Sequence, residues 1–485
     1  MRKTKTMSPL PSIIRTTNAL SVLLRLTEQP VYLVGGAVRD VLLGAQVVND
    51  WDIVVPRGAI ALARQFADAT GGGFVTLAAE HEARPTARVV LGDARYDVVQ
   101  FRGASLDADL RARDLTINAM AVDLRAALAG DDAPLIDPCG GVADLAARQL
   151  RPCGLAVFAD DPLRALRLYR FIATLGFAPT PEAETQARAV AARLATIAPE
   201  RIVDELARLL GAPGAAPAIE GVARRGLWEA IVLEARAGRG MAQSRNHHSD
   251  VFDHNIAAAV AVADFLRALD DWATPYADDF RAWLDTPIAG ERTRRWILPL
   301  AVLLHDAAKP ETRSVKPDGQ PVFPAHERAG GRLAARVAER LQLSRAEHHL
   351  LVASVRWHAQ PNDLQQHGSD HPLRLMAALR DAAPGAIMVA MGDRATARGP
   401  NRPPETVAGD VAFLQGLMRD FFGVYMPLFA TPPLITGDDL IRDLGMRPGR
   451  AIGHALLMVR WRQLTGEVTD RAGALHMAAH LRDAR

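Results

Sequence analysis

The sequence predicts an α/β head over the first 150 residues, followed by a chain that is helical throughout. Strand-like runs rich in Val, Ile and aromatic residues cluster before residue 102 and then almost stop. Alanine-rich stretches with spaced Leu, Val and Ile, such as "AVAARLATIA" and "GRLAARVAERL", have the helical period. A chain of 485 residues is long enough for several domains, each with its own core.

The strands of the head are predicted at five places, each a short run of β-branched or aromatic residues. The runs are "VYLVGG" (31–36), "WDIVVP" (51–56), "GFVTL" (73–77), "ARVVLG" (87–92) and "RYDVVQF" (95–101). A helical stretch, "AIALARQFADAT", lies between the second and third runs. This order predicts a small mixed sheet with helices packed against it.

The rest of the chain is predicted to be helical, with breaks where Gly and Pro cluster. The breaks are "GAPGAAPA" (211–218), "ARAGRGMAQSRN" (235–246) and "ARGPNRPPE" (397–405). We therefore expect four domains. They are the head over 1–150, a helical neck over 151–245, a second helical domain over 246–400 and a helical tail over 401–485.

Composition and charge indicate which partner, redox compartment and cellular location to expect. A net charge of +2 does not demand a nucleic-acid partner, but it leaves room for local basic patches. The two cysteines, Cys139 and Cys153, predict a reducing compartment and a fold that does not depend on disulfides. The basic N-terminal segment has no long apolar stretch behind it, so we expect no signal peptide, no membrane-spanning helix and a cytoplasmic location.

Three aspartates fall on predicted strands of the head. Asp50 and Asp52 share one face of a strand, because side chains alternate with a period of two, and Asp97 lies on another strand. One aspartate alone would more often be a solvated strand end. Three neighbouring carboxylates repel one another unless a cation neutralises them, and Mg²⁺ prefers such ligands together with substrate phosphates. We predict a catalytic site in which two Mg²⁺ ions activate a hydroxyl and stabilise leaving pyrophosphate.

A Gly-Gly pair follows the first predicted strand, where a helix begins. Gly35 and Gly36 let the backbone approach a ligand closely, and the free N–H groups of a helix N-terminus favour a phosphate. Arg39 adds a planar positive fork. A Gly-Gly turn alone is more often a plain turn, so the phosphate assignment depends on the aspartates nearby.

These segments, "LVGGAVRDVLLG" and "NDWDIVV", resemble the signature of class II nucleotidyltransferases, the family of tRNA CCA-adding enzymes and bacterial poly(A) polymerases. Four later segments resemble the further motifs of that family, in order. They are "RARDLTINAMAVD" (111–123), "IDPCGGVADLAARQLR" (136–151), "DDPLRALRLYRFIATLGF" (160–177) and "APERIVDEL" (198–206). The resemblance implies a nucleotidyltransferase-type head and places Arg113 and Asn118 at the nucleotide pocket.

The segment "DDPLRALRLYRF" combines a helix start with three arginines on one helical stripe. Asp161 before Pro162 is a strong N-cap. In the family the matching Asp and Arg read the base. Asp161 can accept from the amino group of cytosine or adenine while Arg164 donates to the adjacent ring nitrogen, which selects CTP and ATP without a template. Arg167 and Arg170 could bind phosphates or merely cover the surface.

Two positions depart from the family pattern. Trp51 stands between the aspartates, where the family has a small or aliphatic residue, and its side chain should face away from the metals. Asp160 replaces the usual Glu, which keeps the charge on a side chain one methylene shorter. Neither departure removes a residue of the predicted site.

A second group of metal-ligand residue types occurs within 246–400, on separate predicted helices. Imidazole and carboxylate ligands suit a divalent transition metal, or Mg²⁺ with bound water. The residues His254, His305, Asp306 and Asp393 resemble the metal ligands of an HD phosphohydrolase domain, and His326 and His358 resemble the extra positions of two-metal members. The resemblance implies hydrolysis of phosphate monoesters or 2′,3′-cyclic phosphates at RNA ends. His248 is expected to lie outside this ligand set.

The motifs favour a tRNA nucleotidyltransferase that adds CMP and AMP to the 3′ end. The basic tail could contact RNA phosphates or could be a solvated helical hairpin. The tail arginines are Arg442, Arg447, Arg450, Arg460 and Arg462. A poly(A) polymerase, or an enzyme that adds only CC or only A, shares the motifs and differs in a flexible head loop. The alternatives outside this class are an HD phosphohydrolase with an RNA-binding head and a non-enzymatic RNA-binding protein.

Overall fold

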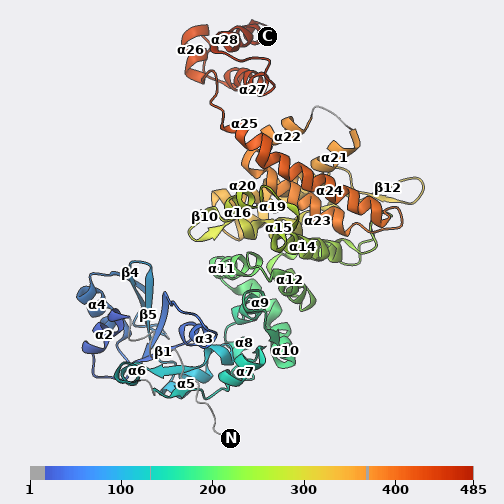
Figure 1. Ribbon diagram of the computed structural model, residues 1–485. Helices are drawn as coiled ribbons and strands as arrows, with labels where there is room; N and C mark the ends of the chain where they lie inside the picture. Colours follow the sequence, from blue (N-terminus) through green and yellow to red (C-terminus); the bar gives the residue numbers. More distant parts are fainter. Residues whose placement is uncertain (1–16, 83, 131–132, 368–370, 484–485) are drawn as a thin grey trace. The chain divides into compact units, whose positions relative to one another are not determined.

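The computed structural model describes residues 17–82, 84–130, 133–367 and 371–483. It divides into two compact units. Unit 1 comprises Met1–Leu209 and Gly221–Ile231, and unit 2 comprises Leu210–Glu220 and Val232–Arg485. Figure 1 shows a sheet with helices in the first unit and mainly helices in the second. The predicted α/β head with a helical remainder is confirmed, and the finer division into four domains stays a prediction.

A seven-stranded sheet forms the centre of unit 1, in the order β3-β4-β5-β2-β1-β6-β7. β2 and β5 are parallel, and the other neighbouring pairs are antiparallel. All five predicted strands are present, whereas β6 and β7 were too short to predict. The strands are β1 (Tyr32–Val34), β2 (Asp50–Val55), β3 (Gly73–Ala78), β4 (Thr86–Leu91), β5 (Ala94–Gln100), β6 (Ala121–Asp123) and β7 (Leu135–Ile136).

The register of three strands brings charged side chains together. Asp52 pairs with Asp97 across the parallel β2–β5 ladder, and Asp97 pairs with Arg88 across β4–β5. On the opposite face Trp51 stacks on Tyr96, with ring centroids 6.4 Å apart and planes 6° from parallel. Trp51 is only 2% exposed. Its predicted orientation, away from the carboxylates, is confirmed, and stacking in the apolar core explains how the large ring is accommodated.

Helices cover the sheet and continue as the neck of unit 1, except that residues 210–220, at the end of α11 and in the first half of α12, belong to unit 2. Gly221 packs so closely on Tyr169 of α9 that a Cβ would lie 2.2 Å from the ring, which ties residues 221–231 into this unit. The helices are α2 (Asn18–Arg25), α3 (Gly36–Leu42), α4 (Ala59–Thr70), α5 (Leu106–Arg111), η1 (Thr116–Asn118), α6 (Leu124–Ala129), α7 (Gly141–Ala147), α8 (Val157–Asp160), α9 (Leu163–Leu175), α10 (Pro181–Val190), η2 (Ala191–Thr196), α11 (Pro199–Leu210), α12 (Ala215–Arg224) and α13 (Leu227–Ile231). The short strands β8 (Gln149–Leu150) and β9 (Ala178–Pro179) pair in parallel.

The core of unit 2 is built around α17 (Ile297–Leu304), whose sequence "ILPLAVLL" is apolar on all sides and fully buried. It packs against α14, α20 and α23. Its other main helices are α14 (Val251–Arg267), α15 (Leu269–Trp272), α16 (Ala277–Leu284), α18 (Lys309–Thr312), α19 (His326–Arg340), α20 (Arg345–Trp357), α21 (Gln360–His367), α22 (His371–Leu379), α23 (Ala383–Thr396), α24 (Pro404–Asp420), α25 (Met426–Ala430), α26 (Gly437–Leu444), α27 (Arg450–Leu464) and α28 (Arg471–Asp483). Two small hairpins pair β10 (Pro287–Ala289) with β11 (Arg292–Thr293), and β12 (Ser314–Val315) with β13 (Pro321–Val322).

One stretch of unit 2, Pro372–Thr396, is long and apolar enough to cross a membrane, with a mean hydropathy of 1.2. Within this stretch, 78% of an apolar segment of 18 residues is buried inside the protein. It includes α23, which packs against α14, α17, α20 and α24. The stretch therefore has the surroundings of a core helix, which needs the same apolar composition.

Candidate active sites

A cavity of about 640 Å³ opens in unit 1. Its walls come from the sheet, the turn before α3, the segment around η1, and the helices α9 and α11. The structure brings every predicted head residue to this cavity. They are Gly35, Gly36, Arg39, Asp50, Asp52, Asp97, Arg113, Asn118, Asp161, Arg164, Arg167 and Arg170.

Asp52 lies at the inner wall of the cavity, next to the glycine turn. Gly35 has a φ of +71°, and a Cβ on it would lie 2.7 Å from Asp52 Oδ2, so only glycine fits there. The Gly36 N–H donates to the Asp52 carboxylate. Burial raises the pKa of Asp52, Arg113 opposes this effect, and Asp97 adds to it. A buried carboxylate with a raised pKa, facing a second carboxylate, is a position where a cation is stabilising.

The other two carboxylates already have arginine partners. Both oxygens of Asp97 accept hydrogen bonds from Arg88, at 2.7 Å from Nε and 2.8 Å from Nη2. Asp50 is mostly exposed, and its Oδ1 lies 3.8 Å from Arg95 Nη1. Among the described residues, the head carboxylates are less tightly gathered than the metal-ligand sets of unit 2. The carboxylate oxygens of these aspartates are hard donors, which fit Mg²⁺. For Asp97 to bind the ion, its hydrogen bonds with Arg88 would have to break.

A continuous chain of polar contacts crosses the cavity from the glycine turn to α9. Arg39 Nη1 donates to Asn118 Oδ1 at 2.6 Å, and Asn118 Nδ2 donates to Asp114 at 3.2 Å. Arg167 Nε donates to the other oxygen of Asp114 at 2.8 Å. Burial alone would raise the pKa of Asp114, but Arg167 outweighs burial and holds that pKa well below its usual range. Arg39 also lies over the Phe171 ring, 5.1 Å from its centroid.

The base-reading pair predicted from the sequence lies at the start of α9. Asp161 Oδ2 lies 2.8 Å from Arg201 Nη2, and its Oδ1 accepts from the Leu163 amide at 3.2 Å. The helix begins at Leu163, so Pro162 occupies the N-cap position and the predicted helix start is one residue early. Arg164 is buried and donates to a backbone carbonyl of α8 at 3.0 Å. Asp161 therefore meets an arginine that was not predicted for the site.

The cavity wall is strongly basic, with eleven arginines against six aspartates. Burial, then the like charges of Arg102 and Arg113, lower the pKa of Arg84 to about 9. Arg170 and Arg167 pair with Glu205, at 3.0 and 3.5 Å. Such crowding of cations is stabilised by a polyanionic ligand. The arginines that were not predicted for the site are Arg84, Arg88, Arg95, Arg102, Arg201 and Arg208. Only Arg201 lies inside a motif that the sequence analysis quoted, "APERIVDEL".

The raised pKa of Asp52 predicts that the contribution of this carboxyl group to the stability of the fold falls as pH rises. The folded state binds the carboxyl proton more tightly than the unfolded state, so this stability is present at low pH and lost as pH rises through the folded pKa. Asp52→Asn mimics the neutral form. In chelator-containing buffer above pH 7 it should therefore raise the free energy of unfolding in urea, by on the order of 1 kcal/mol. At pH 4 the gain should shrink, and an equal gain at both pH values would contradict the raised pKa.

Unit 2 brings together the second group of predicted ligands. In each of two sets, the possible ligand atoms lie within 4.8 Å of one another. The first set is His254, His305, Asp306 and Asp393, and the second is Asp306, His326 and His358. Asp306 belongs to both sets, at 3.3 Å from His305 and 3.3 Å from His326 through its two oxygens. This arrangement suits two neighbouring metal ions with Asp306 between them.

Backbone contacts orient the histidine rings for metal binding. In His305, His326 and His358, Nδ1 lies 2.7, 2.9 and 2.7 Å from the carbonyl oxygen three residues earlier. Each Nδ1–H therefore donates to the backbone, and each Nε2 is left as the free lone pair. The rings of His254 and His305 lie 5.3 Å apart, edge to face. A fixed tautomer of this kind is typical of metal-ligating histidine.

Three of the shifted groups are held in the form that binds a metal, whereas Asp306 outweighs burial and raises the pKa of His305 and of His326, whose protons a bound cation would displace. Burial alone would raise the pKa of Asp306, but His305 and Lys309 hold it well below its usual range, and Lys309 Nζ lies 2.5 Å from Asp306 Oδ2. Burial is likewise outweighed at Asp393, where a hydrogen bond with His254 keeps the pKa low. Burial and two neighbouring histidines lower the pKa of His358 to about 3. Ionised carboxylates and neutral imidazole are the forms that bind a divalent cation.

A further histidine at this centre was not predicted. The His247 ring lies 4.4 Å from that of His254, edge to face, whereas its neighbour His248 is exposed, as expected. The loop that carries His247 is held by Gln243, which accepts from Lys309 Nζ at 2.7 Å. The adjacent histidines of "HHSD" are indistinguishable in the sequence, because loop geometry alone decides which one turns inward.

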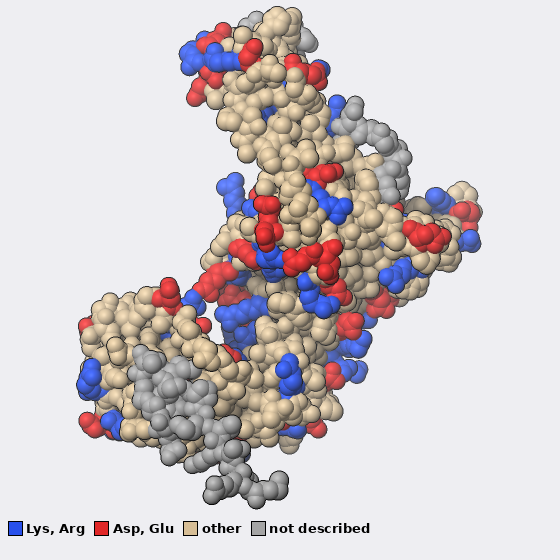
Figure 2. All heavy atoms as spheres, in the orientation of Figure 1, with Lys and Arg blue, Asp and Glu red and all other residues tan. Residues whose placement is uncertain are grey.

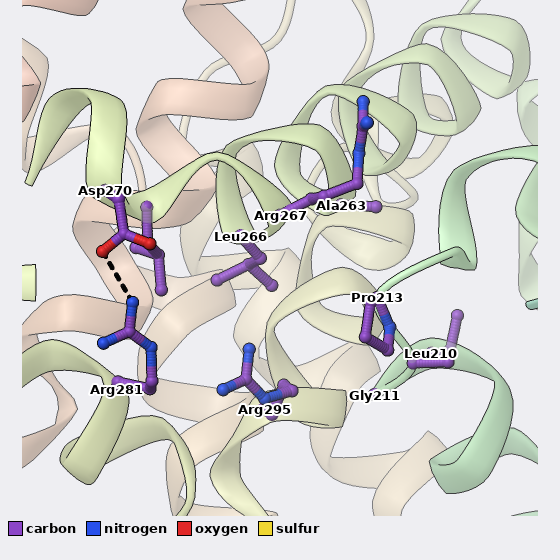
Figure 3. A pocket seen from close by; sticks show the side chains of 11 residues that line it. Leu210, Gly211, Pro213, Ala263, Leu266, Arg267, Asp270, Arg281 and Arg295 are labelled. Carbon is purple, nitrogen blue, oxygen red and sulfur yellow. Dashed lines mark hydrogen bonds and ion pairs between the residues drawn. The ribbon is translucent and has the colours of Figure 1, made fainter. Parts of the chain in front are cut away.

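Another cavity of unit 2, of about 210 Å³, contains none of the predicted residues. Figure 3 shows Arg281 paired with Asp270 at its edge, at 2.7 Å, with Arg295 below Leu266. Arg267 and Arg295 pair with aspartates as well, at 2.8 Å each. This cavity contains none of the predicted site residues, and each of its three arginines is paired with an aspartate, so no function is assigned to it.

The tail arginines are also largely paired. Figure 2 shows acidic and basic side chains side by side over α26, where Arg442 contacts Asp439 and Asp443. Arg462 pairs with Glu467, and Arg460 donates to backbone carbonyls of the 429–432 segment. The predicted basic neighbourhood is therefore weaker than its arginines alone suggest, because acidic partners neutralise part of it.

Comparison with known proteins fits the geometry of the head. Residues 31–151 match the Poly A polymerase head domain, and residues 176–237 match the probable RNA and SrmB-binding site of polymerase A. The A-adding tRNA nucleotidyltransferase of Deinococcus radiodurans is 34% identical, over 90% of this chain and 92% of the relative. The CC-adding tRNA nucleotidyltransferase of Geobacter sulfurreducens is 32% identical, over 96% and 94%.

A solved structure shares the fold. The Thermotoga maritima CCA-adding enzyme complexed with tRNA superposes with a TM-score of 0.57 at 23% identity, covering 99% of this chain and 98% of that one. Two relatives above 30% identity, each matched over more than nine-tenths of its length, agree with the head motifs and the basic cavity. The chain therefore belongs to the class II nucleotidyltransferase family of tRNA CCA-adding enzymes and bacterial poly(A) polymerases.

Proposed function

We propose that this protein adds CMP and AMP to the 3′ end of tRNA from CTP and ATP, in the cytoplasm. The observation that carries the proposal is the basic cavity lined by all twelve predicted head residues. Eleven arginines suit a nucleoside triphosphate and an RNA end, and three carboxylates lie on the strands beside them. The relatives that add A or CC to tRNA support the same substrate class.

The residues have distinct roles in this proposal. Asp50, Asp52 and Asp97 would hold Mg²⁺, and Asp97 would also orient the 3′-hydroxyl. When bound, Mg²⁺ supplies positive charge at the α-phosphate and lowers the pKa of the attacking hydroxyl. The turn at Gly35 and Gly36 lets the backbone approach the triphosphate closely, while the Gly36 amide holds Asp52. The arginines of the cavity wall would stabilise the leaving pyrophosphate by their positive charge.

Further side chains complete the nucleotide site in this proposal. Arg39 and Arg113 bind triphosphate oxygens together with the glycine turn. Asn118 holds Arg39 in place, since the Arg39 guanidinium donates to its side chain. Arg167 and Arg170 are anchored by Asp114 and Glu205, so they present fixed positive charge rather than free side chains.

Base choice is assigned to Asp161 and Arg164. Asp161→Ala removes the acceptor for the amino group of cytosine and adenine, so the preference for CTP over UTP should fall about 10- to 100-fold. The measurement is kcat/KM for each nucleotide with one tRNA. Asp160→Ala is the matched control, because Asp160 is the adjacent exposed carboxylate. An unchanged CTP preference in Asp161→Ala would assign base choice elsewhere.

The experiment for the proposal uses one tRNA transcript in three forms: lacking CCA, ending in CC, and complete. CTP and ATP are supplied separately and together with Mg²⁺, and products are sized on a sequencing gel. Three added nucleotides followed by a stop are expected. A long A ladder would identify a poly(A) polymerase. No addition to any form would refute nucleotidyl transfer.

A partial activity, adding only CC or only A, is the second candidate within the same class. The observation that favours it is that two relatives covered over nine-tenths of their length are a CC-adding and an A-adding enzyme. The same gel separates the three outcomes. Two C residues on the shortest form, or one A on the form ending in CC, would each identify the matching partial enzyme.

For unit 2 we propose a metal-dependent phosphohydrolase of the HD type. Its support is the pair of ligand sets that share Asp306, with Nδ1 of three histidines bound to the backbone. A bound divalent metal would supply a hydroxide at neutral pH and polarise a phosphoryl oxygen. Lys309 pairs with Asp306 and donates to Gln243, so it would hold the shared carboxylate in place. Metal-dependent release of phosphate from phosphate monoesters and 2′,3′-cyclic nucleotides, without any NTP, tests this activity.

A further inference from the structure

The protein has two cysteines among 485 residues, and the fold brings them together. Both are free and partly buried, and the two thiols hydrogen-bond to each other. Both pack against the same apolar cluster of unit 1, which includes Val34, Ala119 and Ala121. Random placement of two cysteines in a chain of this length would seldom make them neighbours. The contact between the two thiols therefore points to a chemical role for the pair.

Backbone contacts fix both cysteines around one segment of the nucleotide cavity. The Cys153 N–H donates to the Asp114 carbonyl at 3.2 Å, and a bridge joins Leu115 to Pro152. On the other side, the turn that carries Cys139 leads into Gly141, where a Cβ would lie 2.3 Å from the Thr116 carbonyl oxygen. These contacts hold the two thiols together independently of the thiol contact itself.

The surroundings of the pair favour thiol–disulfide chemistry. The hydrogen bond from the Cys153 thiol lowers the pKa of Cys139, and the Arg111 guanidinium acts in the same direction. The same contact, together with burial, raises the pKa of Cys153 and keeps this thiol protonated until Cys139 has reacted. A partly exposed thiol of lowered pKa next to a second thiol is the arrangement of a nucleophilic and a resolving cysteine.

We propose that Cys139 and Cys153 form a redox-active dithiol that closes to an intramolecular disulfide on reaction with a low-molecular-weight disulfide. The Cys139 thiolate attacks one sulfur of the reagent, forms a mixed disulfide and releases one thiolate. Cys153 then loses its proton to solvent and attacks the Cys139 sulfur. The Cys139–Cys153 bond forms, a second thiolate leaves, and two electrons pass from the protein to the reagent.

The test uses the reduced full-length protein and oxidised glutathione, with an acid quench, alkylation and intact mass. We expect a loss of two hydrogen atoms, no retained glutathione, a Cys139–Cys153 peptide in the digest and a rate independent of protein concentration. Cys153→Ser should instead accumulate a stable glutathione adduct on Cys139. A stable adduct on the wild type, two alkylatable thiols after treatment, or disulfide-linked dimers would each overturn the proposal.

Thermal unfolding gives a second measurement, which does not depend on any enzymatic activity. The bond would link segments that already contact one another, so the oxidised wild type should unfold at a higher temperature than the reduced protein. Dithiothreitol should reverse the gain, and Cys139→Ser should show none. A lower unfolding temperature after closure would show that the thiols are not placed for a bond.

Discussion

Asp52→Asn should reduce nucleotide addition at least about a thousandfold, because the neutral amide binds Mg²⁺ far more weakly than a carboxylate does. Asp52 is partly buried and lies between the Gly36 amide, which donates to it, and Asp97. The measurement is the initial rate of CMP incorporation into tRNA lacking CCA, over a range of Mg²⁺ concentrations. A residual rate within tenfold of wild type would remove Asp52 from the catalytic role.

Two comparisons separate this loss from unfolding. Asp68→Asn is the matched control, since Asp68 is an exposed carboxylate on α4 and lies outside the cavity. It should keep the wild-type rate. Asp52→Asn itself should be at least as stable as wild type above pH 7, because the substitution removes a buried charge whose pKa folding raises. An inactive variant with unchanged or increased stability would assign the loss to chemistry.

Asp306→Asn should abolish metal binding in unit 2 and reduce phosphate release at least about a hundredfold, because one carboxylate serves both ligand sets. The measurements are metal content after dialysis against Co²⁺, Ni²⁺ or Zn²⁺, and phosphate release from a 2′,3′-cyclic nucleotide. A chelator should remove the wild-type activity, and one of these metals should restore it.

The controls for Asp306→Asn test whether the two sites are independent. Asp420→Asn changes an exposed carboxylate at the end of α24 and should leave metal content and phosphate release unchanged. Asp306→Asn itself should keep full nucleotide addition, because unit 1 carries its own carboxylates. Wild-type metal content in Asp306→Asn would contradict the shared-ligand arrangement.

The head could be predicted from the sequence because its signals are local. Alternation with a period of two places Asp50 and Asp52 on one face, and a glycine pair after a strand predicts a close approach of the backbone. Both signals need only a few neighbouring residues. Arg113 and Asn118 were predicted from the family resemblance rather than from a local pattern, as was the base-reading role of Asp161. The structure collects all of these residues around one cavity, whose wall also contains arginines that were not predicted.

The unpredicted residues share a physical cause, which is pairing across the fold. Arg88 reaches Asp97 only because β4 and β5 pair in one register, and a displacement by one residue would turn Arg88 to the other face. Arg201 of α11 meets Asp161, which precedes α9, although the two residues are 40 positions apart in the chain. His247 was missed for a related reason, since the loop that aims it depends on Gln243 and Lys309. No local pattern encodes such contacts.

The chain passes between the two units more than once, which limits where the protein can be truncated. Unit 1 is completed by residues 221–231, after the chain has already contributed 210–220 to unit 2. A head fragment ending at 209 would lose Gly221, which packs on Tyr169, and the fully buried Trp228. Such a fragment would expose apolar surface and aggregate. Separate expression of the two activities therefore requires point variants in the intact chain rather than truncation.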